Sequence, residues 1–397
     1  MTDRRQRLGD DNPTAIPFAG LRRNAAAIVG GLIILVAIWL VPDLTPPSSI
    51  PPPVVLVHAR VTELLPTTGG PGEPDARVVI VDGPNAGEEL DVFLQGPSGQ
   101  QEIPRYEVGD EVILNVSQQG EGEAFIAVAD RFRIAPLALL LAIFAVAVTL
   151  VGGWRGVRSL LALVLTLGII IRIVVPLLLA GWDPVPLAVV SATIVTIITF
   201  TLTEGIRPTT IAAAAGTFLS LALTALLAVA FNALARFTVL QGSPDLVFLQ
   251  DAGRAELDLG GLLLAAVIFG ALGILDDVTV TQAATVHELH DADPRAGRSV
   301  LFWRAMNVGR SHIAATVNTL ALAYVGASLP LIVLLNAGQQ DPFLTVSGEI
   351  IAVEIVKAVV GSIGIVAAVP ATTAMAVLLV GRAWDLLDRQ EKPAGWN

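Results

Sequence analysis

Long apolar runs follow one another from residue 134 to residue 381, separated mainly by short polar loops. A transmembrane helix needs about 20 apolar residues, and only helices and closed barrels satisfy every backbone polar group inside lipid. The chain is 54% hydrophobic, which is typical of such a protein. We therefore predict a polytopic α-helical membrane protein with about eight transmembrane helices. The predicted spans are residues 25–42, 134–151, 160–180, 185–203, 209–231, 259–281, 313–335 and 349–379.

The first apolar run, residues 25–42, precedes the one soluble domain that the sequence predicts. Arg22 and Arg23 stand before it, as the charged region of a signal peptide does. Because no small-x-small cleavage site follows the run, we favour an uncleaved signal anchor over a cleaved signal peptide. The two arginines place the N-terminal tail, residues 1–24, in the cytoplasm.

Residues 54–133 form the predicted soluble domain, after a proline-rich spacer at residues 46–53. Segments rich in β-branched residues alternate there with turn residues such as Gly83 and Gly109. The predicted strands are residues 54–64, 76–83, 88–94, 110–116 and 124–133. Five short strands in a small domain favour an OB-like β-barrel. The aromatic platform on which such barrels stack bases is missing, so we predict a structural or partner-docking role and no nucleic-acid binding.

Composition excludes several kinds of chemistry. The chain has no cysteine, which rules out disulfides, thiolate metal sites and a cysteine nucleophile. Residues 43–133 hold 15 Asp/Glu and 5 Lys/Arg, a balance of −10 out of −11 for the whole chain. The sequence contains no phosphate-binding glycine loop, nucleophile elbow or Ser/His/Asp arrangement on an accessible face. We therefore predict that the chain is not an enzyme and that it has no cofactor, a bound cation excepted.

Arginines gather in the loops that follow every second span, which indicates the orientation of the chain. These loops contain Arg155 and Arg158, then Arg207, then the segment 295–310, and the C-terminal tail 382–397 is also basic. Because positive loops stay in the cytoplasm, we predict both termini inside and the β domain outside. The membrane block then covers residues 134–381 with seven spans. Its last run is too long for one simple span, and Pro370 predicts a kink or a broken helix there.

Two adjacent carboxylates, Asp276 and Asp277, stand in the segment FGALGILDDVTVTQ near the inner end of the sixth span. Ionisable groups at membrane depth are costly and usually functional. Neighbouring residues differ by about 100° around a helix, so the two carboxylates face different partners. The alternative is that both lie at the interface and only solvate the helix end. We favour a proton- or cation-binding site because apolar residues continue beyond them.

The seventh span enters from the same side as SHIAATVNTLAL and carries Thr316, Asn318 and Thr319 within its first turns. Amide and hydroxyl oxygens can hydrogen-bond a protonated carboxyl or serve as neutral ligands of a cation. Ordinary hydrogen bonding between helices is the alternative reading, and the two are compatible. We expect these three side chains to lie at about the depth of the aspartates.

Other charged and histidine residues are weaker site candidates. Arg172 has apolar sequence on both sides, so we expect it to reach a carboxylate such as Glu354 or the outer interface. Lys357, three residues beyond Glu354, is positioned to pair with it on one helix face or to snorkel outwards. His287 and His290 are spaced to share a metal, but a solvated cytoplasmic helix is the favoured reading.

The assembled segments resemble the YibE/F-like family of bacterial multi-span proteins. The matching stretches are GALGILDDVTVTQAATVHEL, VGRSHIAATVNTLALAYVGASLPL and EIVKAVVGSIGIVAAVPATTA. One span, an extracytoplasmic β domain and a multi-span block also come in the same order. The resemblance implies the bacterial cytoplasmic membrane as location. Carried over by motif, it implies functional roles for Asp276, Asp277, Thr279, Asn318 and Thr319.

A fainter likeness is to the RND superfamily, including its protein-export accessory subunits. In those proteins too, a first span leads to an exported domain and then to a membrane block with polar residues on adjacent spans. The predicted seven spans after the domain depart from the five of one export subunit. This departure weakens the case for homology, and hence for proton-driven domain motion.

Two functional hypotheses follow from the sequence. The first is a transporter or permease-like protein for an unknown small solute or ion, with the acidic site in the sixth and seventh spans. The second is a non-transporting scaffold or accessory protein whose β domain docks an extracytoplasmic protein partner. In both, the lipid bilayer is the main partner, and a homo-oligomer is compatible with the sequence.

Overall fold

The computed structural model describes residues 18–42, 55–65, 75–94, 106–117, 125–237, 258–337 and 341–379. The chain divides into two compact units. One unit consists of Met1–Pro46 and Thr149–Asn397, and the other is Pro47–Val148. The proline-rich spacer and the C-terminal tail of the sequence prediction lie outside the described residues, as does most of the N-terminal tail.

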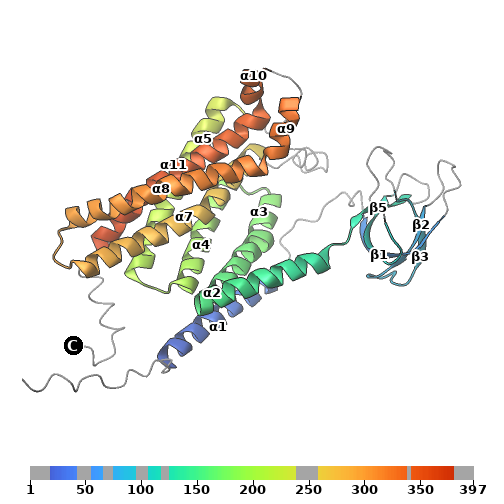
Figure 1. Cartoon of the computed structure of the whole chain (residues 1–397), viewed down its shortest axis with the longest axis horizontal. Helices are drawn as coiled ribbons and strands as arrows, with labels where there is room; N and C mark the ends of the chain where they lie inside the picture. Colours follow the sequence, from blue (N-terminus) through green and yellow to red (C-terminus); the bar gives the residue numbers. More distant parts are fainter. Residues whose placement is uncertain are drawn as a thin grey trace, which may run out of the picture. The chain divides into compact units, whose positions relative to one another are not determined.

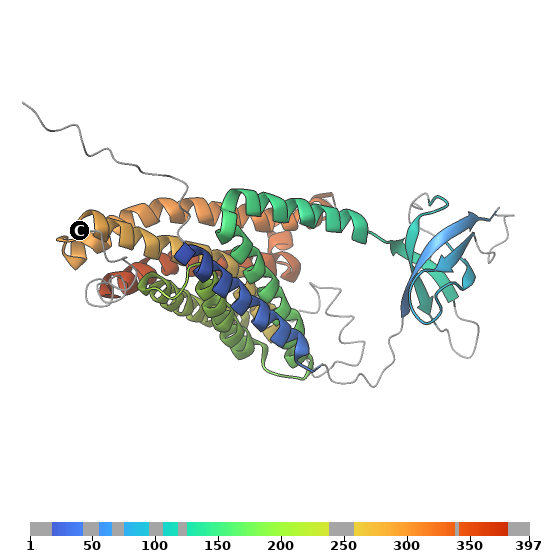
Figure 2. The same cartoon turned by 90° about the horizontal axis from the view of Figure 1, so that it is seen from below.

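The larger unit is helical (Figure 1). Its first helix, α1, packs against α4 and the short π-helix η1 (Figure 2). The helices α7, α8 and α11 lie side by side, and α5 packs along α7 and α11. The helices of the described residues are α1 (Phe18–Leu40), α2 (Ile134–Ile169), η1 (Ile170–Val174), α3 (Val175–Leu179), α4 (Pro184–Thr203), α5 (Pro208–Ala235), α7 (Leu259–Ala292), α8 (Arg298–Ala327), α9 (Leu329–Ala337), α10 (Pro342–Ser347) and α11 (Glu349–Leu379).

Five helical stretches within the described residues are long and apolar enough to cross a membrane, and Ala25–Leu40 is a shorter apolar helix. The predicted eight spans are therefore not confirmed. One difference lies in Ile134–Leu179, a single apolar stretch where two spans and a loop were predicted. Gly153, inside the predicted loop, has a φ of 53° and a ψ of −137°, which break the helix there and divide the stretch in two. The predicted seventh span is divided between the end of α8 and α9, with a turn at Ser328. The five stretches are Ile134–Leu179, Pro184–Thr203, Pro208–Ala235, Leu259–Ala292 and Glu349–Leu379.

Helix boundaries follow from local side-chain chemistry. Asp183 caps α4 by accepting a hydrogen bond from the backbone N–H of Val185, and Pro184 occupies the first turn. Asp258 caps α7 in the same way through the backbone N–H of Gly261. The last helix, α11, continues through Pro370 without a break. The broken helix predicted at Pro370 is therefore not present, and the missing N–H of proline removes one hydrogen bond from its ladder.

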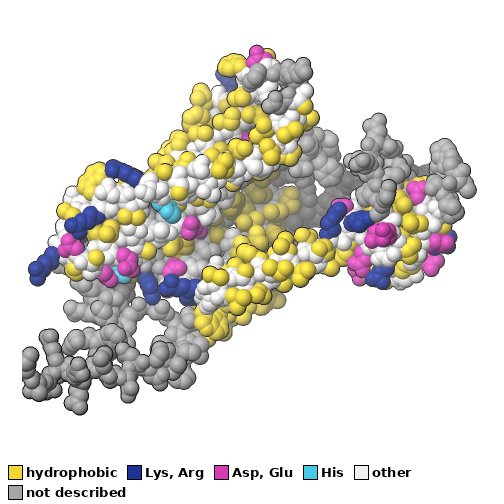
Figure 3. All heavy atoms as spheres, viewed as in Figure 1, with side chains coloured by type: hydrophobic (Ala, Val, Ile, Leu, Met, Phe, Trp, Pro, Cys, Tyr) yellow, Lys and Arg dark blue, Asp and Glu magenta, His cyan; other side chains and the backbone are white. Residues whose placement is uncertain are grey.

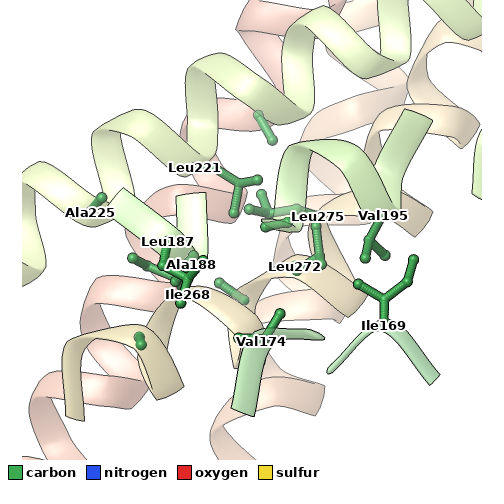
Figure 4. Packing of buried hydrophobic residues seen from close by; sticks show 14 of the residues in the cluster. Ile169, Val174, Leu187, Ala188, Val195, Leu221, Ala225, Ile268, Leu272 and Leu275 are labelled. Carbon is green, nitrogen blue, oxygen red and sulfur yellow. The ribbon is translucent and has the colours of Figure 1, made fainter. Parts of the chain in front are cut away.

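The core of the helical unit is a layer of aliphatic side chains shared by α4, α5 and α7 (Figure 4). Leu221, Ile268 and Leu275 are fully buried there. Lipid tails are as apolar as these side chains, so van der Waals packing and close helix approach hold the layer together. Hydrophobic side chains also cover much of the outer surface of the helices (Figure 3). That surface is typical of a protein embedded in lipid.

Small residues allow α5 to approach α11 closely. Gly216 of α5 lies directly against Thr372 of α11, and Gly364 of α11 lies against Thr224 of α5. The two contacts run in opposite chain directions, so the helices cross antiparallel. Because each glycine lacks a side chain, the threonine of the other helix reaches its backbone.

The smaller unit contains a five-stranded antiparallel sheet in the order β3-β2-β1-β4-β5. The predicted small β domain is therefore present, with each strand inside its predicted segment or within one residue of it. Alternate residues such as Val61, Val78, Val112 and Leu114 point into its core. The strands are β1 (Val55–Leu64), β2 (Ala76–Ile80), β3 (Glu89–Val92), β4 (Glu111–Ser117) and β5 (Phe125–Arg131).

The two edge strands of this sheet approach each other without closing it. Phe93, directly after β3, forms a single parallel bridge to Ala127 of β5. The backbone N–H of Phe93 donates to the carbonyl of Ile126, at 3.2 Å, and the N–H of Val128 donates to the carbonyl of Phe93, at 2.8 Å. One bridge is not a closed barrel, so the predicted OB-like barrel is not confirmed.

Charged side chains form cross-strand pairs on the surface of the β unit. Arg77 donates to Asp91 at 2.8 Å, and this pair raises the pKa of Arg77. Arg60 donates to Glu111 at 2.8 Å, which lowers the pKa of Glu111. Figure 3 shows charged side chains on this unit and at the end of the helical bundle where α7 meets α8. Exposed pairs of this kind add little stability and mainly keep the surface soluble.

The glycine contact between α5 and α11 gives a stability prediction. A methyl group at position 216 would lie 2.9 Å from the Cα atom of Thr372, closer than side-chain carbons normally come to a backbone. We expect Gly216→Ala to lower the free energy of unfolding by about 1–3 kcal/mol, measured by detergent unfolding of the full chain. Gly273→Ala on α7 is the matched control, because nothing lies within 4 Å of its added methyl. Equal unfolding midpoints for the two variants would contradict the close contact.

Candidate functional site

The carboxylate of Asp276 lies on α7 beside α4 and is half-buried. The Thr196 hydroxyl of α4 donates a hydrogen bond to its Oδ1 atom at 3.0 Å. The hydroxyl of Thr217 on α5 also faces this carboxylate. Thr196 is 2% exposed and Thr217 is fully buried. Side chains from three helices therefore meet at one acidic group.

A third threonine is linked to this carboxylate through Thr217. Thr279, one turn after Asp276 on α7, donates to the main-chain carbonyl of Asp276 at 3.2 Å. Its Oγ1 atom is also 2.8 Å from Oγ1 of Thr217, and either hydroxyl can donate in that bond. Both threonines are fully buried. We call Asp276, Thr196, Thr217 and Thr279 the threonine–aspartate site.

No Lys, Arg or His of the described residues forms an ion pair with Asp276 within 4.0 Å. A carboxylate removed from water without a counter-charge is costly, and the cost is met by a proton or by a bound cation. Hydroxyl donors lower the cost but add no positive charge. The site is therefore suited to exchange between protonated, ionised and cation-bound states.

A groove of about 530 Å³ runs between α4 and α5 and reaches the same threonines. Thr196 and Thr217 belong to its wall, so the groove includes hydroxyls that face Asp276. Volumes of this size accommodate small ligands. Its wall is mostly apolar with several hydroxyls, from Thr193, Thr196, Ile197, Phe200, Thr201, Ile206, Thr210, Ile211, Ala214, Ala215, Thr217 and Phe218.

Comparison with known proteins places the sequence in a family. The model of the YibE/F-like protein family matches residues 140–382, which is more than half of the chain. The chain belongs to this family. Together with the apolar helices, the match indicates a multi-pass membrane protein. No curated protein and no solved structure matches the chain.

The other predicted site residues are Asp277, Thr316, Asn318 and Thr319, and no hydrogen bond among the described residues joins them to the threonine–aspartate site. Asp277 is exposed, and its neighbour Asp276 is turned towards α4. Thr316 and Thr319 on α8 donate to carbonyls of their own helix, those of His312 and Ala315. Asn318 is exposed on the same helix. The observed hydroxyl neighbours of Asp276 thus come from α4, α5 and α7 in place of the predicted ones on α8.

Of the two alternatives predicted for Arg172, a carboxylate such as Glu354 or the outer interface, the contact with Glu354 is not formed. Its Nη2 atom donates to the main-chain carbonyl of Val41 at 3.0 Å, at the end of α1. Its guanidinium also lies 5.6 Å from the centre of the Trp39 ring. A cation at the carboxyl end of a helix is favoured by the helix dipole. Arg172 therefore fastens η1 to α1.

Glu354 and Lys357 form the ion pair that their spacing predicts, at 2.7 Å between Nζ and Oε1. They lie one turn apart on α11. Each charge is offset by the other within a span-length apolar helix, which lowers the cost of placing both there. This pair belongs to α11 alone and does not include Arg172.

The first of the two histidines of α7 has an acidic neighbour on the same helix. His287 lies 3.7 Å from Asp291, between Nδ1 and Oδ1, one turn further along the helix. No group of three or more His, Cys, Asp or Glu side chains within the described ranges is arranged to hold a metal ion. The pairing is consistent with the solvated helix that the sequence favoured for His287 and His290.

Sequence reasoning missed a buried polar contact that joins α7, α8 and α11. The Gln282 amide donates to the carbonyl of Ala305 at 3.1 Å and to the Thr373 hydroxyl at 2.7 Å. Gln282 is 3% exposed and Thr373 is fully buried. The signal that could have found it is the spacing of Gln282 one turn beyond Val278 and Thr279 on the buried face of α7.

Substitution of Gln282 tests this contact. In Gln282→Ala, the buried Thr373 hydroxyl loses the amide N–H that donates to it, and a cavity opens. We expect it to lower the free energy of unfolding by about 1–3 kcal/mol, measured by thermal unfolding in detergent. Thr285→Ala is the matched control on α7, because Thr285 bonds only to the carbonyl of Thr281 in its own helix. A loss of stability no larger than that of Thr285→Ala would show that the contact contributes nothing.

Proposed function

We propose that this YibE/F-like protein is a membrane transporter or permease-like protein in which Asp276 binds a proton or cation. The observation that carries the proposal is a half-buried carboxylate with threonine donors and no ion-pair partner in the described residues. Ionisable residues inside membrane proteins commonly mark ion or proton pathways. The proposal involves no covalent chemistry.

Two features near the site support a route for an ion. The groove between α4 and α5 is lined in part by Thr196 and Thr217. The buried hydroxyls of Ser220 and Thr372 have no hydrogen-bond partner in the described part of the chain. They belong to α5 and α11, the helices that cross at Gly216. Unpaired buried hydroxyls in native proteins usually indicate a water or ion that completes their bonding.

For the orientation, we propose a bacterial cytoplasmic membrane with both termini inside and the β unit outside. The arginine-bearing segment 295–310 supports this arrangement through the positive-inside rule. We also propose that the β unit belongs to the OB-like class. The parallel bridge between Phe93 and Ala127 supports this, since it joins the two edge strands of the sheet.

A second candidate function is a scaffold or accessory protein whose β unit docks an extracytoplasmic protein. The observation in its favour is a set of exposed apolar side chains on that unit. Val55 is 51% exposed, Leu56 64% and Val108 63%. Exposed apolar residues of this kind are common at protein interfaces when they form a patch. Under this hypothesis, removal of the β unit abolishes function while changes at Asp276 are silent.

Flux measurements on the full chain in lipid vesicles test the first proposal. We expect Asp276→Asn to abolish proton or alkali-cation flux, because the amide neither ionises nor releases a proton. Proton flux is followed with a pH-sensitive dye and cation flux with radioactive sodium. Glu288→Gln is the matched control, since Glu288 is exposed on the same helix.

Three results distinguish the proposals. Loss of flux in Asp276→Asn with normal flux in Glu288→Gln supports transport through the threonine–aspartate site. Normal flux in Asp276→Asn overturns it. The scaffold hypothesis is supported by three results together. The unaltered chain shows no flux, Asp276→Asn keeps full function in cells, and removal of the β unit abolishes that function.

A further inference from the structure

The threonine–aspartate site has more acceptor lone pairs than protons to fill them. Each threonine hydroxyl has one donor proton and two acceptor positions, and an ionised carboxylate only accepts. The site therefore has three hydroxyl protons as donors. Its acceptors are one carboxylate, three hydroxyl oxygens and the carbonyl of Asp276, which accepts from Thr279. The site is rich in lone pairs and poor in positive charge.

All of these donor atoms are oxygen, and most of them are neutral. Hydroxyl, carbonyl and carboxylate oxygens are hard ligands, which suit alkali and alkaline-earth cations better than zinc or copper. The four side chains contain no nitrogen or sulfur ligand. The chemistry of the site therefore selects a hard cation.

The charge of the site selects a monovalent cation over a divalent one. Asp276 supplies one negative charge, and Asp277 is exposed rather than turned to the same partners. A monovalent ion makes the site neutral, whereas a divalent ion leaves an uncompensated positive charge among buried groups. Magnesium also gives up its water reluctantly and needs several anionic or water ligands.

We propose that Asp276, Thr196, Thr217 and Thr279 bind a largely dehydrated monovalent alkali cation, of the sodium class, that enters along the groove between α4 and α5. The inference rests on the proposed transport function and names the ion that the site takes. The hydroxyls turn their protons outwards and present lone pairs to the ion. Thr196 and Thr217 belong to both the groove wall and the site, so an ion in the groove meets two of its ligands there.

Carbodiimide labelling of the purified full chain tests this ion directly. A hydrophobic carbodiimide reacts with a protonated buried carboxyl group, and a cation bound to that group blocks the reaction. We expect sodium chloride to slow labelling of Asp276, read by mass spectrometry of the peptide, relative to choline chloride at equal ionic strength and pH. Binding of radioactive sodium to the same preparation is the second readout, and we expect Asp276→Asn to lose it.

Substitutions of the hydroxyls separate ligands from packing residues. We expect Thr196→Val and Thr217→Val to raise the sodium concentration for half-protection by about tenfold or more, as expected for loss of one good ligand. Thr203→Val is the matched control, because Thr203 donates only to the carbonyl of Thr199 in its own helix. The sodium concentration for half-protection in Thr203→Val should equal that of the unaltered chain.

The possible failures are distinguishable. If sodium and choline protect Asp276 equally and no sodium binds, the alkali-cation inference is wrong. A proton flux that still depends on Asp276 would then leave the proposed function standing. If flux does not depend on Asp276 either, both proposals are wrong. If Asp276 is not labelled in either salt, the binding of radioactive sodium decides. Sodium binding that is lost in Asp276→Asn supports the inference, and sodium binding that persists in Asp276→Asn overturns it.

Discussion

The close contact between α5 and α11 is the constraint on which the candidate site depends. Gly216 and Gly364 let the two helices approach until each touches a threonine of the other. The same helix, α5, also packs against α7, where Thr217 meets Thr279. A larger side chain at either glycine would push α5 away from α11 and so shift the helix that carries Thr217. The position of one hydroxyl of the site therefore depends on packing at another face of the same helix.

Hydroxyl groups carry most of the polar contacts inside this helical unit. A threonine that bonds to its own helix needs no partner elsewhere, as Thr203 and Thr316 show. The same residue type can instead reach a neighbouring helix, as Thr196 does towards Asp276. Thr372 has no partner among the described residues, although it is fully buried. The bundle therefore combines self-satisfied hydroxyls, which only pack, with a few whose bonding depends on other helices.

The helical class, the β strands and an acidic group within a long apolar helix could all be predicted from the sequence. Each of these depends on local composition or periodicity. The helices that surround Asp276 could not be predicted, because residues 196, 217 and 276 are distant in the chain and only packing brings them together. Arg172 shows the same limit, since its partner carbonyl lies at Val41. The break at Gly153 was predicted to be part of a loop because glycine and arginine there are usual loop residues.

That break at Gly153 has a topological consequence. Its backbone angles, φ 53° and ψ −137°, suit glycine and strain other residues. The apolar stretch Ile134–Leu179 is long enough for two crossings, and the break divides it into segments that are each about as long as a bilayer is thick. The number of crossings in this stretch sets the parity of all later helices, and therefore the side of the membrane on which the charged turn between α7 and α8 lies.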